Sequence, residues 1–269
     1  MQHGGASDGV SVRVHGVRAS VAGVCAELRE RYPSVAIERV PWYEQALVIR
    51  GIARNVLVDD PLIESGCVYL QELASMLPAL VLDPQPGERI LDLCAAPGGK
   101  TLQLADLMED TGEIVASDVS RTRLYKLRAL LERYGVSSVE PRLGKGEFLW
   151  RTFADQFDGV LVDAPCSMGM ERSARERKAL ARGQTFLLRS ALACVRPGGR
   201  VVYATCTDAA EENEDVVAWI LAHVPGVVQD PITGAAHEHG SVTPAGVVRI
   251  EKERRGPFFV AQFTRLLDE

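Results

Sequence analysis

The chain has 269 residues, 46% of them hydrophobic and 25% charged, which suits one large folded domain with a small appendage. Its net charge of −6 excludes loose, field-driven binding of polyanions by the whole surface, but it leaves room for a local basic face. No run of about 18 apolar residues occurs, which excludes a membrane-spanning helix, and the polar, Gly-rich start lacks the features of a signal peptide.

The first part of the chain predicts a small α+β lobe. Residues 1–10 are expected to be a flexible N-terminus, and residues 11–68 form the lobe with its connector. The expected elements are a strand over 11–17, a helix over 20–32, strands over 34–40 and 46–51, and a connector over 53–68.

From residue 69 to the end at 269, apolar strands alternate with amphipathic helices. This pattern predicts an α/β domain with a mostly parallel sheet covered on both faces, closed by a C-terminal antiparallel hairpin over 247–253 and 257–267. The expected strands cover 88–94, 113–118, 139–143, 157–165 and 200–206. The expected helices cover 70–83 with a break at Pro78, then 98–108, 120–135, 184–195, and 208–224 opened by a capping box at Asp208 and Glu211.

Cysteine is the residue type that carries most information in this chain. None of the six cysteines forms a CxxC pair, so no metal site is expected, and His237 and His239 are interpreted as residues of a polar loop. Without a secretion signal the thiols are expected to be reduced, as in a cytoplasmic protein; an organelle is the alternative. Three cysteines end apolar runs: Cys94, Cys166 and Cys206.

In parallel α/β sheets, ligands bind beyond the carboxyl ends of the strands. The three cysteines are expected at that rim, together with the strand-end carboxylates Asp118 and Asp163. The Gly-rich turn "DLCAAPGGKT" (92–101) starts a helix there and matches neither GxGxxG nor GxxxxGK[ST]. Its backbone N–H groups suit an anion, and Asp118 suits a ribose, so a nucleoside with a carboxylate tail such as S-adenosylmethionine fits. NAD is the competing interpretation.

A cluster of cations follows Cys166. It is made up of Arg172, Arg175, Arg177, Lys178, Arg182 and Arg189. Glu171 and Glu176 are interleaved with these cations, so a solvated helix face is as plausible as an RNA-facing surface.

Several motifs occur in a fixed order along the chain. They are "DLCAAPGGKT" (92–101), "VDAPCSMG" (162–169), "RPGGRVVYATCT" (196–207) with "EENE" (211–214), and "GPFFVAQF" (256–263). Together they resemble the RNA cytosine-5 methyltransferases of the NOL1/NOP2/Sun family over roughly residues 11–266. The resemblance implies a Rossmann-like class I methyltransferase sheet, with residues 69–269 as the S-adenosylmethionine-dependent catalytic domain.

The resemblance also implies roles for individual residues. Cys206 is the nucleophile that adds to carbon 6 of the target cytosine, Cys166 helps to release the product, and Asp163 contacts the cytosine beside the cofactor. By analogy with DNA cytosine-5 methyltransferases, Cys166 would attack instead. Asp118 holds the ribose, and the rest of the cofactor site is Cys94, Ala95, Ala96, Pro97, Gly98, Gly99 and Lys100.

The expected partner is RNA, either ribosomal or transfer RNA, with no membrane. A partner protein that binds RNA is also considered, because no appended RNA-binding domain is seen. One departure from the family pattern is Gly144-Lys145, where a carboxylate near the adenine is expected. The alternative function is therefore a catalytically weak or inactive RNA-binding or ribosome-assembly subunit that retains the fold.

Overall fold

The computed structural model describes residues 9–168, 170, 172–233, 241–242, 248–250 and 257–267, and only the backbone of 241–242 and 248–250. Residues 1–8, most of the predicted flexible N-terminus, lie outside the described residues, as do His237 and His239.

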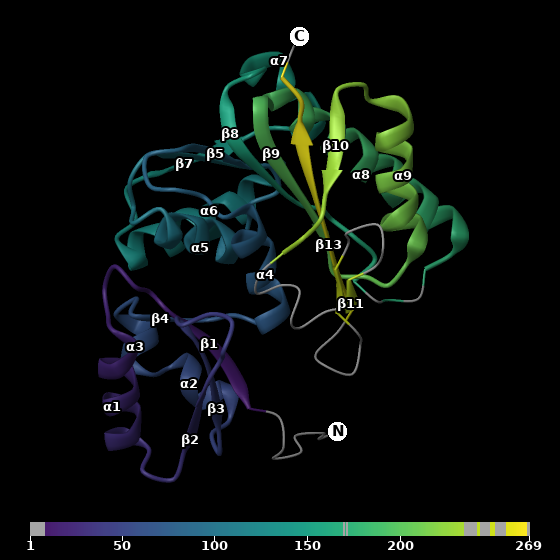
Figure 1. Cartoon of the computed structure of the whole chain (residues 1–269). Coiled ribbons are helices and arrows are strands. Elements are labelled where there is room, and N and C mark those ends of the chain that lie inside the picture. Colours follow the sequence, from purple (N-terminus) through teal and green to yellow (C-terminus); the bar gives the residue numbers. More distant parts are fainter. Residues whose placement is uncertain are drawn as a thin grey trace.

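The N-terminal part forms a small antiparallel sheet with the strand order β2-β3-β1-β4 (Figure 1). Its strands are β1 (Val10–Val14), β2 (Ala36–Arg39), β3 (Ala46–Arg50) and β4 (Val68–Leu70). Its helices are α1 (Val21–Arg31), α2 (Arg54–Val58) and α3 (Pro61–Glu64). The predicted division of the chain between residues 68 and 69 falls inside β4; where the domains divide stays a prediction.

The rest of the chain forms a larger sheet in which five neighbouring strands are parallel, in the order β9-β8-β5-β6-β7. These are β5 (Arg89–Asp92), β6 (Glu113–Asp118), β7 (Val139–Leu143), β8 (Phe157–Asp163) and β9 (Val195–Thr205). The long strand β13 (Phe258–Arg265) runs antiparallel to β9. On its other side β13 pairs with β12 (Val248–Ile250) and β10 (Val227–Asp230), and β11 (Ser241–Val242) pairs with β12. The predicted mostly parallel sheet with a C-terminal antiparallel hairpin is confirmed.

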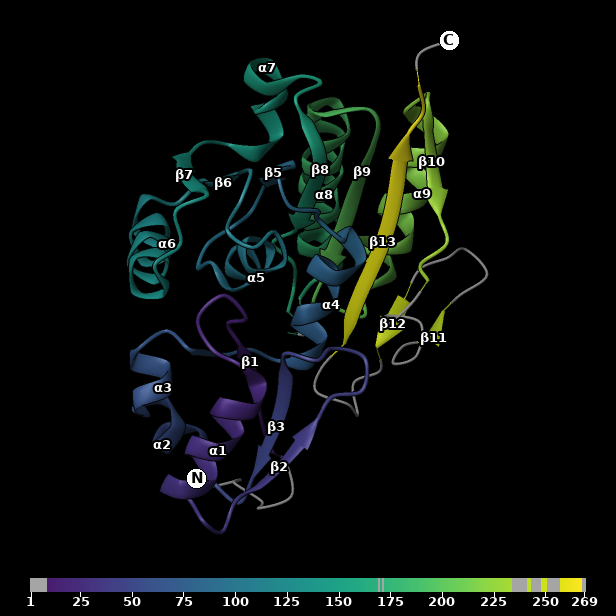
Figure 2. The ribbon, with the colours of Figure 1, turned by 60° about the vertical axis from the view of Figure 1, so that its left-hand side comes forward.

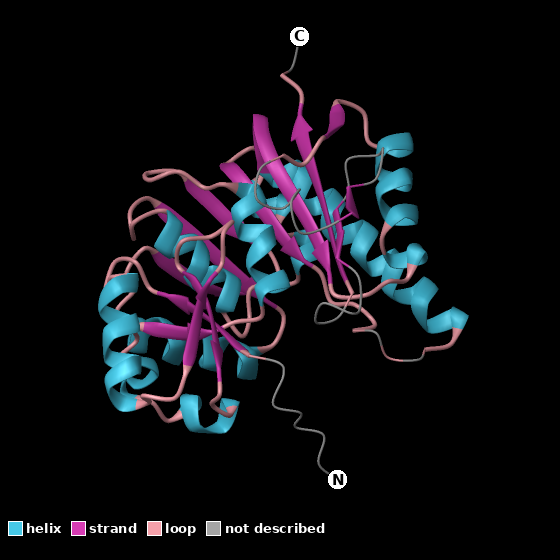
Figure 3. Cartoon of the chain, turned by 60° about the horizontal axis from the view of Figure 1, so that its bottom comes forward, coloured by secondary structure: helices cyan, strands magenta, loops and turns pink. Residues whose placement is uncertain are grey.

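Helices cover both faces of this sheet, as Figure 3 shows. They are α4 (Leu73–Leu82), α5 (Gly99–Leu107), α6 (Arg121–Tyr134), α7 (Trp150–Phe153), α8 (Ala174–Cys194) and α9 (Glu214–His223), with the short 3-10 helices η1 (Gly146–Phe148) and η2 (Ala210–Glu212). One apolar core joins the sheet to α8 and α9, and a second joins it to α4 and α5. Since β13 points away from the small sheet and β9 runs antiparallel to it, the carboxyl ends of the parallel strands face the small sheet (Figure 2).

Three helix boundaries differ from the prediction. Helix α4 continues through Pro78 without the predicted break. Helix α8 begins ten residues before Gln184, because Ser173 and Glu176 form a reciprocal capping box. The predicted capping box at Asp208 is wrong, because a 3-10 turn intervenes and α9 begins only at Glu214.

A buried polar network joins the small sheet to α5. Arg13, fully buried on β1, donates from Nη1 to Asp106 Oδ2 (2.7 Å) and from Nε to Gln71 Oε1 (3.1 Å). His15 Nδ1 lies 2.8 Å from the other oxygen of Asp106. Burial opposes ionisation of Asp106, but the hydrogen bond to His15 and the charge of Arg13 outweigh it and lower its pKa. The junction therefore depends on an ionised carboxylate.

Replacing Asp106 by Asn is expected to destabilise the protein by roughly 3 kcal/mol or more, because it leaves the buried guanidinium of Arg13 without its counter-charge. The stabilisation in the wild type is fully present above the ordinary Asp pKa of 3.8 and is lost as the pH falls through the lower folded value. Urea unfolding at neutral pH measures the effect. Glu38→Gln, which removes an exposed partner of Arg50, is the control and should change stability by less than about 1 kcal/mol. Equal effects of the two substitutions would contradict this account of the junction.

Candidate active site

Two thiols meet at the carboxyl ends of β8 and β9. Cys166 follows β8 by three residues and Cys206 follows β9 directly. The strands pair in parallel with Asp163 opposite Ala204, so their ends lie side by side. The two Sγ atoms are 3.0 Å apart, and the backbone N–H of Cys206 donates to Cys166 Sγ (3.3 Å). Both cysteines are free thiols.

A hydrogen-bonded scaffold holds the two loops that carry these thiols. The hydroxyls of Ser167 and Thr207, each one residue further on, lie 2.8 Å apart. The buried carboxylate of Glu212 accepts from the Ser167 backbone N–H (3.0 Å) and from Gln184 Nε2 (2.8 Å). Asn213 donates to the Thr207 carbonyl (2.9 Å) and accepts from the Thr205 hydroxyl. Glu212 and Asn213 therefore hold the two loops by hydrogen bonds instead of belonging to the first turn of a helix, which explains why α9 starts later than predicted.

The two thiols share a proton unequally. The hydrogen bond from the Cys206 thiol lowers the pKa of Cys166, assisted by backbone N–H groups of Cys206 and Met168 and opposed by burial. The same hydrogen bond raises the pKa of Cys206, and burial adds to the rise. When one proton is lost from the pair, the negative charge therefore settles on Cys166 and the remaining proton on Cys206.

Lys100, at the start of α5, reaches across to the end of β8. Its Nζ donates to Asp163 Oδ2 (2.8 Å) and to Ser75 Oγ (2.8 Å), and it lies 5.5 Å from the centre of the Phe258 ring. This ion pair places a carboxylate and a cation on the same rim as the two thiols.

Two adjoining cavities lie along the Gly-rich turn. The first, about 250 Å³, is lined by Asp118, Lys145, Glu147, Phe186 and Leu187 among others. The second, about 210 Å³, is lined by Tyr69, Asp92, Ala95, Ala96, Pro97, Gly99, Lys100 and Asp163 among others. Cys94 lines both, so one elongated molecule could occupy the two together.

The turn itself needs glycine at residue 98. Its φ is +115°, and a Cβ there would lie 2.5 Å from Leu127 Cδ1. The close packing of this turn on α6 brings the backbone of residues 95–97 to the wall of the second cavity.

Two carboxylates at the ends of β5 and β6 face these cavities. Asp118 accepts from the backbone N–H groups of Ala96 (3.2 Å) and Ser120 (2.8 Å) and forms an ion pair with Arg123. Asp92 is buried and accepts the Thr101 hydroxyl at Oδ2 (2.7 Å), while its Oδ1 has no hydrogen-bond partner in the described part of the chain. Burial raises the pKa of Asp92 to about 7. A buried, unpaired carboxylate oxygen beside a cavity suits a cationic group of a ligand.

The third rim cysteine differs from the other two. Burial raises the pKa of Cys94, assisted by the nearby charge of Asp92, so its thiol stays protonated. Its contribution to the site is to line the two cavities.

The structure places Cys166 and Cys206 in the thiol pair. The residues predicted for the cofactor line the two cavities, except Gly98, which shapes the turn. The roles of all these residues stay predictions.

Sequence reasoning missed Asp92, Ser75, Glu147 and Glu212. Asp92 and Glu212 lie inside the quoted motifs. The available signals were the place of Asp92 at the end of a predicted strand and the place of Glu212 in the motif "EENE". Glu147, three residues after Gly144, supplies a carboxylate to the first cavity. From the sequence, this carboxylate was sought at Gly144-Lys145 and Glu147 was not predicted.

Comparison with solved structures gives the class of fold. The chain superposes on a methyltransferase homolog protein from Pyrococcus horikoshii with a TM-score of 0.84 and 30% identity, covering 96% of this chain and 87% of that one. NSun6 from Pyrococcus horikoshii has the same fold, with a TM-score of 0.86 and 24% identity over 97% of this chain and 91% of that one. The large sheet is thus that of the Rossmann-like methyltransferases.

Comparison of sequences gives the family. Residues 79–264 match the model of the 16S rRNA methyltransferase RsmB/F family, and the chain belongs to that family. It is 37% identical over 246 residues to ribosomal RNA small subunit methyltransferase F of Klebsiella pneumoniae, covering 84% of this chain and 51% of the relative. The homologue of Escherichia coli O127:H6 is 35% identical over 233 residues, covering 81% and 48%. The chain therefore spans about half the length of these curated relatives. Its described helices include none long and apolar enough to span a membrane.

Proposed function

We propose that the chain transfers a methyl group from S-adenosylmethionine to carbon 5 of a cytosine in structured RNA, through a covalent bond between Cys206 and carbon 6. The observation that carries this proposal is the pair of thiols, 3.0 Å apart, beside a pair of cavities at the rim of the sheet. The names of the curated relatives favour ribosomal RNA of the small subunit over transfer RNA as substrate. That substrate supports a cytoplasmic location.

The cavities fit S-adenosylmethionine. When bound, this cofactor supplies an electrophilic methyl carbon on a sulfonium. Asp118 would accept hydrogen bonds from the ribose hydroxyls, and the free Oδ1 of Asp92 would receive the ammonium group. Backbone groups of the Gly-rich turn would hold the carboxylate. Glu147 is the carboxylate that this chain offers on the segment lining the adenosine side.

Carbon 5 of cytosine is a poor nucleophile until a thiolate adds to carbon 6 and makes the ring enamine-like. In our proposal Cys206 makes that bond, and its proton passes to Cys166, the thiolate beside it. Cys166 releases this proton to solvent. After methylation Cys166 accepts the proton from carbon 5, the pair of electrons left on the ring expels the Cys206 thiolate, and the product is free.

Asp163 is the group that would contact N3 or N4 of the cytosine, because it lies on the same rim and is oriented by Lys100 and, through Lys100, by Ser75. The target base must leave any stack to reach these residues, so base flipping or a single-stranded target is part of the proposal.

The alternative is a catalytically weak subunit that binds RNA and assists ribosome assembly. The observation in its favour is the absence of a carboxylate at Gly144 and Lys145. Against it stand Glu147 in the same cavity and the intact thiol pair.

Transfer to carbon 5 must release the hydrogen of that carbon. With small-subunit ribosomal RNA labelled with tritium at carbon 5 of cytosine, tritium should appear in water in step with methyl incorporation from S-adenosylmethionine. Transfer RNA is the matched substrate control and should give less of both. Methyl incorporation without tritium release would contradict transfer to carbon 5, and no incorporation with either RNA would favour the assembly subunit.

The cofactor site should respond to pH through Asp92. Because its pKa is about 7, lowering the pH from about 8 to about 6 protonates the carboxylate and should weaken S-adenosylmethionine binding by roughly tenfold, measured by calorimetry. Asp92→Asn should bind weakly at both pH values. Asp118→Ala is the control: it should lose at least about tenfold at both values but keep the pH dependence. A pH dependence that persists in Asp92→Asn would assign it to another group.

A further inference from the structure

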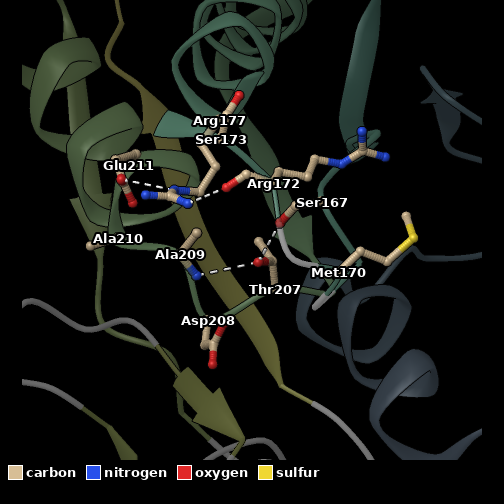
Figure 4. A pocket seen from close by; sticks show the side chains of 10 residues that line it. All are labelled: Ser167, Met170, Arg172, Ser173, Arg177, Thr207, Asp208, Ala209, Ala210 and Glu211. Atoms are coloured by element: carbon tan, nitrogen blue, oxygen red, sulfur yellow. Dashed lines mark hydrogen bonds and ion pairs between the residues drawn. The ribbon is translucent and has the colours of Figure 1, made fainter. Parts of the chain in front are cut away.

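A third and larger hollow, of about 770 Å³, opens next to the loops that carry the two thiols, and Figure 4 shows the residues that line it. Ser167 and Thr207, which directly follow Cys166 and Cys206, line it, and Arg177, Ala210 and Glu211 form other parts of its wall. It shares no lining residue with the two cavities along the Gly-rich turn. The proposed cofactor site therefore leaves it free for another part of the substrate.

The lining of this hollow is polar and firmly oriented. The hydroxyls of Ser167 and Thr207 are bonded to each other at its base. Arg177 donates from Nε to Glu211 Oε1 (3.0 Å) and from Nη1 to the Arg172 carbonyl (2.6 Å), so its guanidinium is fixed along the wall, as Figure 4 shows. Hydroxyls and a fixed guanidinium plane suit the sugar and base edge of a nucleotide.

A short line of cations begins next to the hollow, on the outward face of α8. Arg175, Lys178 and Arg182 are all exposed and lie at helical spacings of three and four, so they share one face over about 10 Å. Within the described part of the chain none of the three has an ion-pair partner. The acids nearby are engaged elsewhere, since Glu176 caps Ser173 and Glu211 pairs with Arg177.

We infer that the hollow and these three cations bind the RNA strand that flanks the target cytosine. A neighbouring nucleotide occupies the hollow, and phosphates further along the strand follow Arg175, Lys178 and Arg182. This inference rests on the proposed function, and it deepens that function by assigning a docking surface for the RNA. The overall negative charge of the chain makes a local surface necessary for binding a polyanion.

The cations are tested by the salt dependence of RNA binding. The combined variant Arg175→Ala, Lys178→Ala and Arg182→Ala should bind a fluorescent small-subunit ribosomal RNA transcript more weakly. The slope of log affinity against log salt concentration should become shallower by about 2 to 3. The matched control combines Arg121→Ala, Lys126→Ala and Arg128→Ala on the exposed face of α6, which removes the same charge. Affinity for S-adenosylmethionine should be unchanged in both. Equal slopes in the two triple variants would overturn the inference.

The hollow is tested by filling it. Ala210→Trp should raise the KM for RNA and leave kcat and cofactor affinity near wild type, because it blocks a neighbouring nucleotide without touching the thiols. Ala218→Trp, on an exposed position of α9 outside the hollow, is the control and should change neither constant. If methyl transfer proceeds and Ala210→Trp behaves like its control, only this inference fails. If the wild type neither binds RNA nor transfers methyl groups, the proposed function fails with it.

Discussion

Two sulfur atoms 3.0 Å apart are held by the geometry of parallel strands. Neighbouring strands of a sheet lie about 4.8 Å apart, so the pairing of β8 with β9 is enough to bring residues just beyond their ends within contact distance. Glu212 then fixes the loops by accepting from the Ser167 backbone N–H, and Asn213 and Gln184 fix them by donating to the backbone carbonyls of Thr207 and Pro165. The cavities, the ion pair and the larger hollow are all arranged around this contact.

The charges at the rim follow from the same arrangement. Asp92, Asp118 and Asp163 end three parallel strands, so three carboxyl groups lie on one edge of the sheet. Lys100 pairs with Asp163 and Arg123 pairs with Asp118, which compensates only part of the negative charge. Burial of Asp92 favours its neutral form until a cation approaches. A positively charged cofactor is therefore complementary to the strand-end carboxylates, and the exposed cations of α8 are complementary to a polyanion.

Much of this site could be predicted from sequence, because strand ends in a parallel sheet share one edge. That rule alone brings Cys166, Cys206 and Asp163 together from separate apolar runs. The roles of Glu212 and Asn213 could not be predicted, because they depend on side chains reaching back to a loop instead of capping a helix. The helix predicted over 184–195 begins ten residues too late because residues 174–183 lack an apolar period, and Glu147 was missed because a 3-10 turn brings it to the cavity.

The central claim is that one thiol makes the bond to cytosine and the other completes its release. In Cys166→Ala the largest cause of the raised Cys206 pKa is gone, so Cys206 should still attack, but the carbon-5 proton cannot readily leave. The measurement is a denaturing gel of RNA incubated with enzyme and S-adenosylmethionine. Cys166→Ala should give a shifted protein–RNA band, which is absent in Cys206→Ala and in the double variant, while Cys67→Ala should behave like wild type. A shifted band in Cys206→Ala and none in Cys166→Ala would contradict the account and make Cys166 the nucleophile.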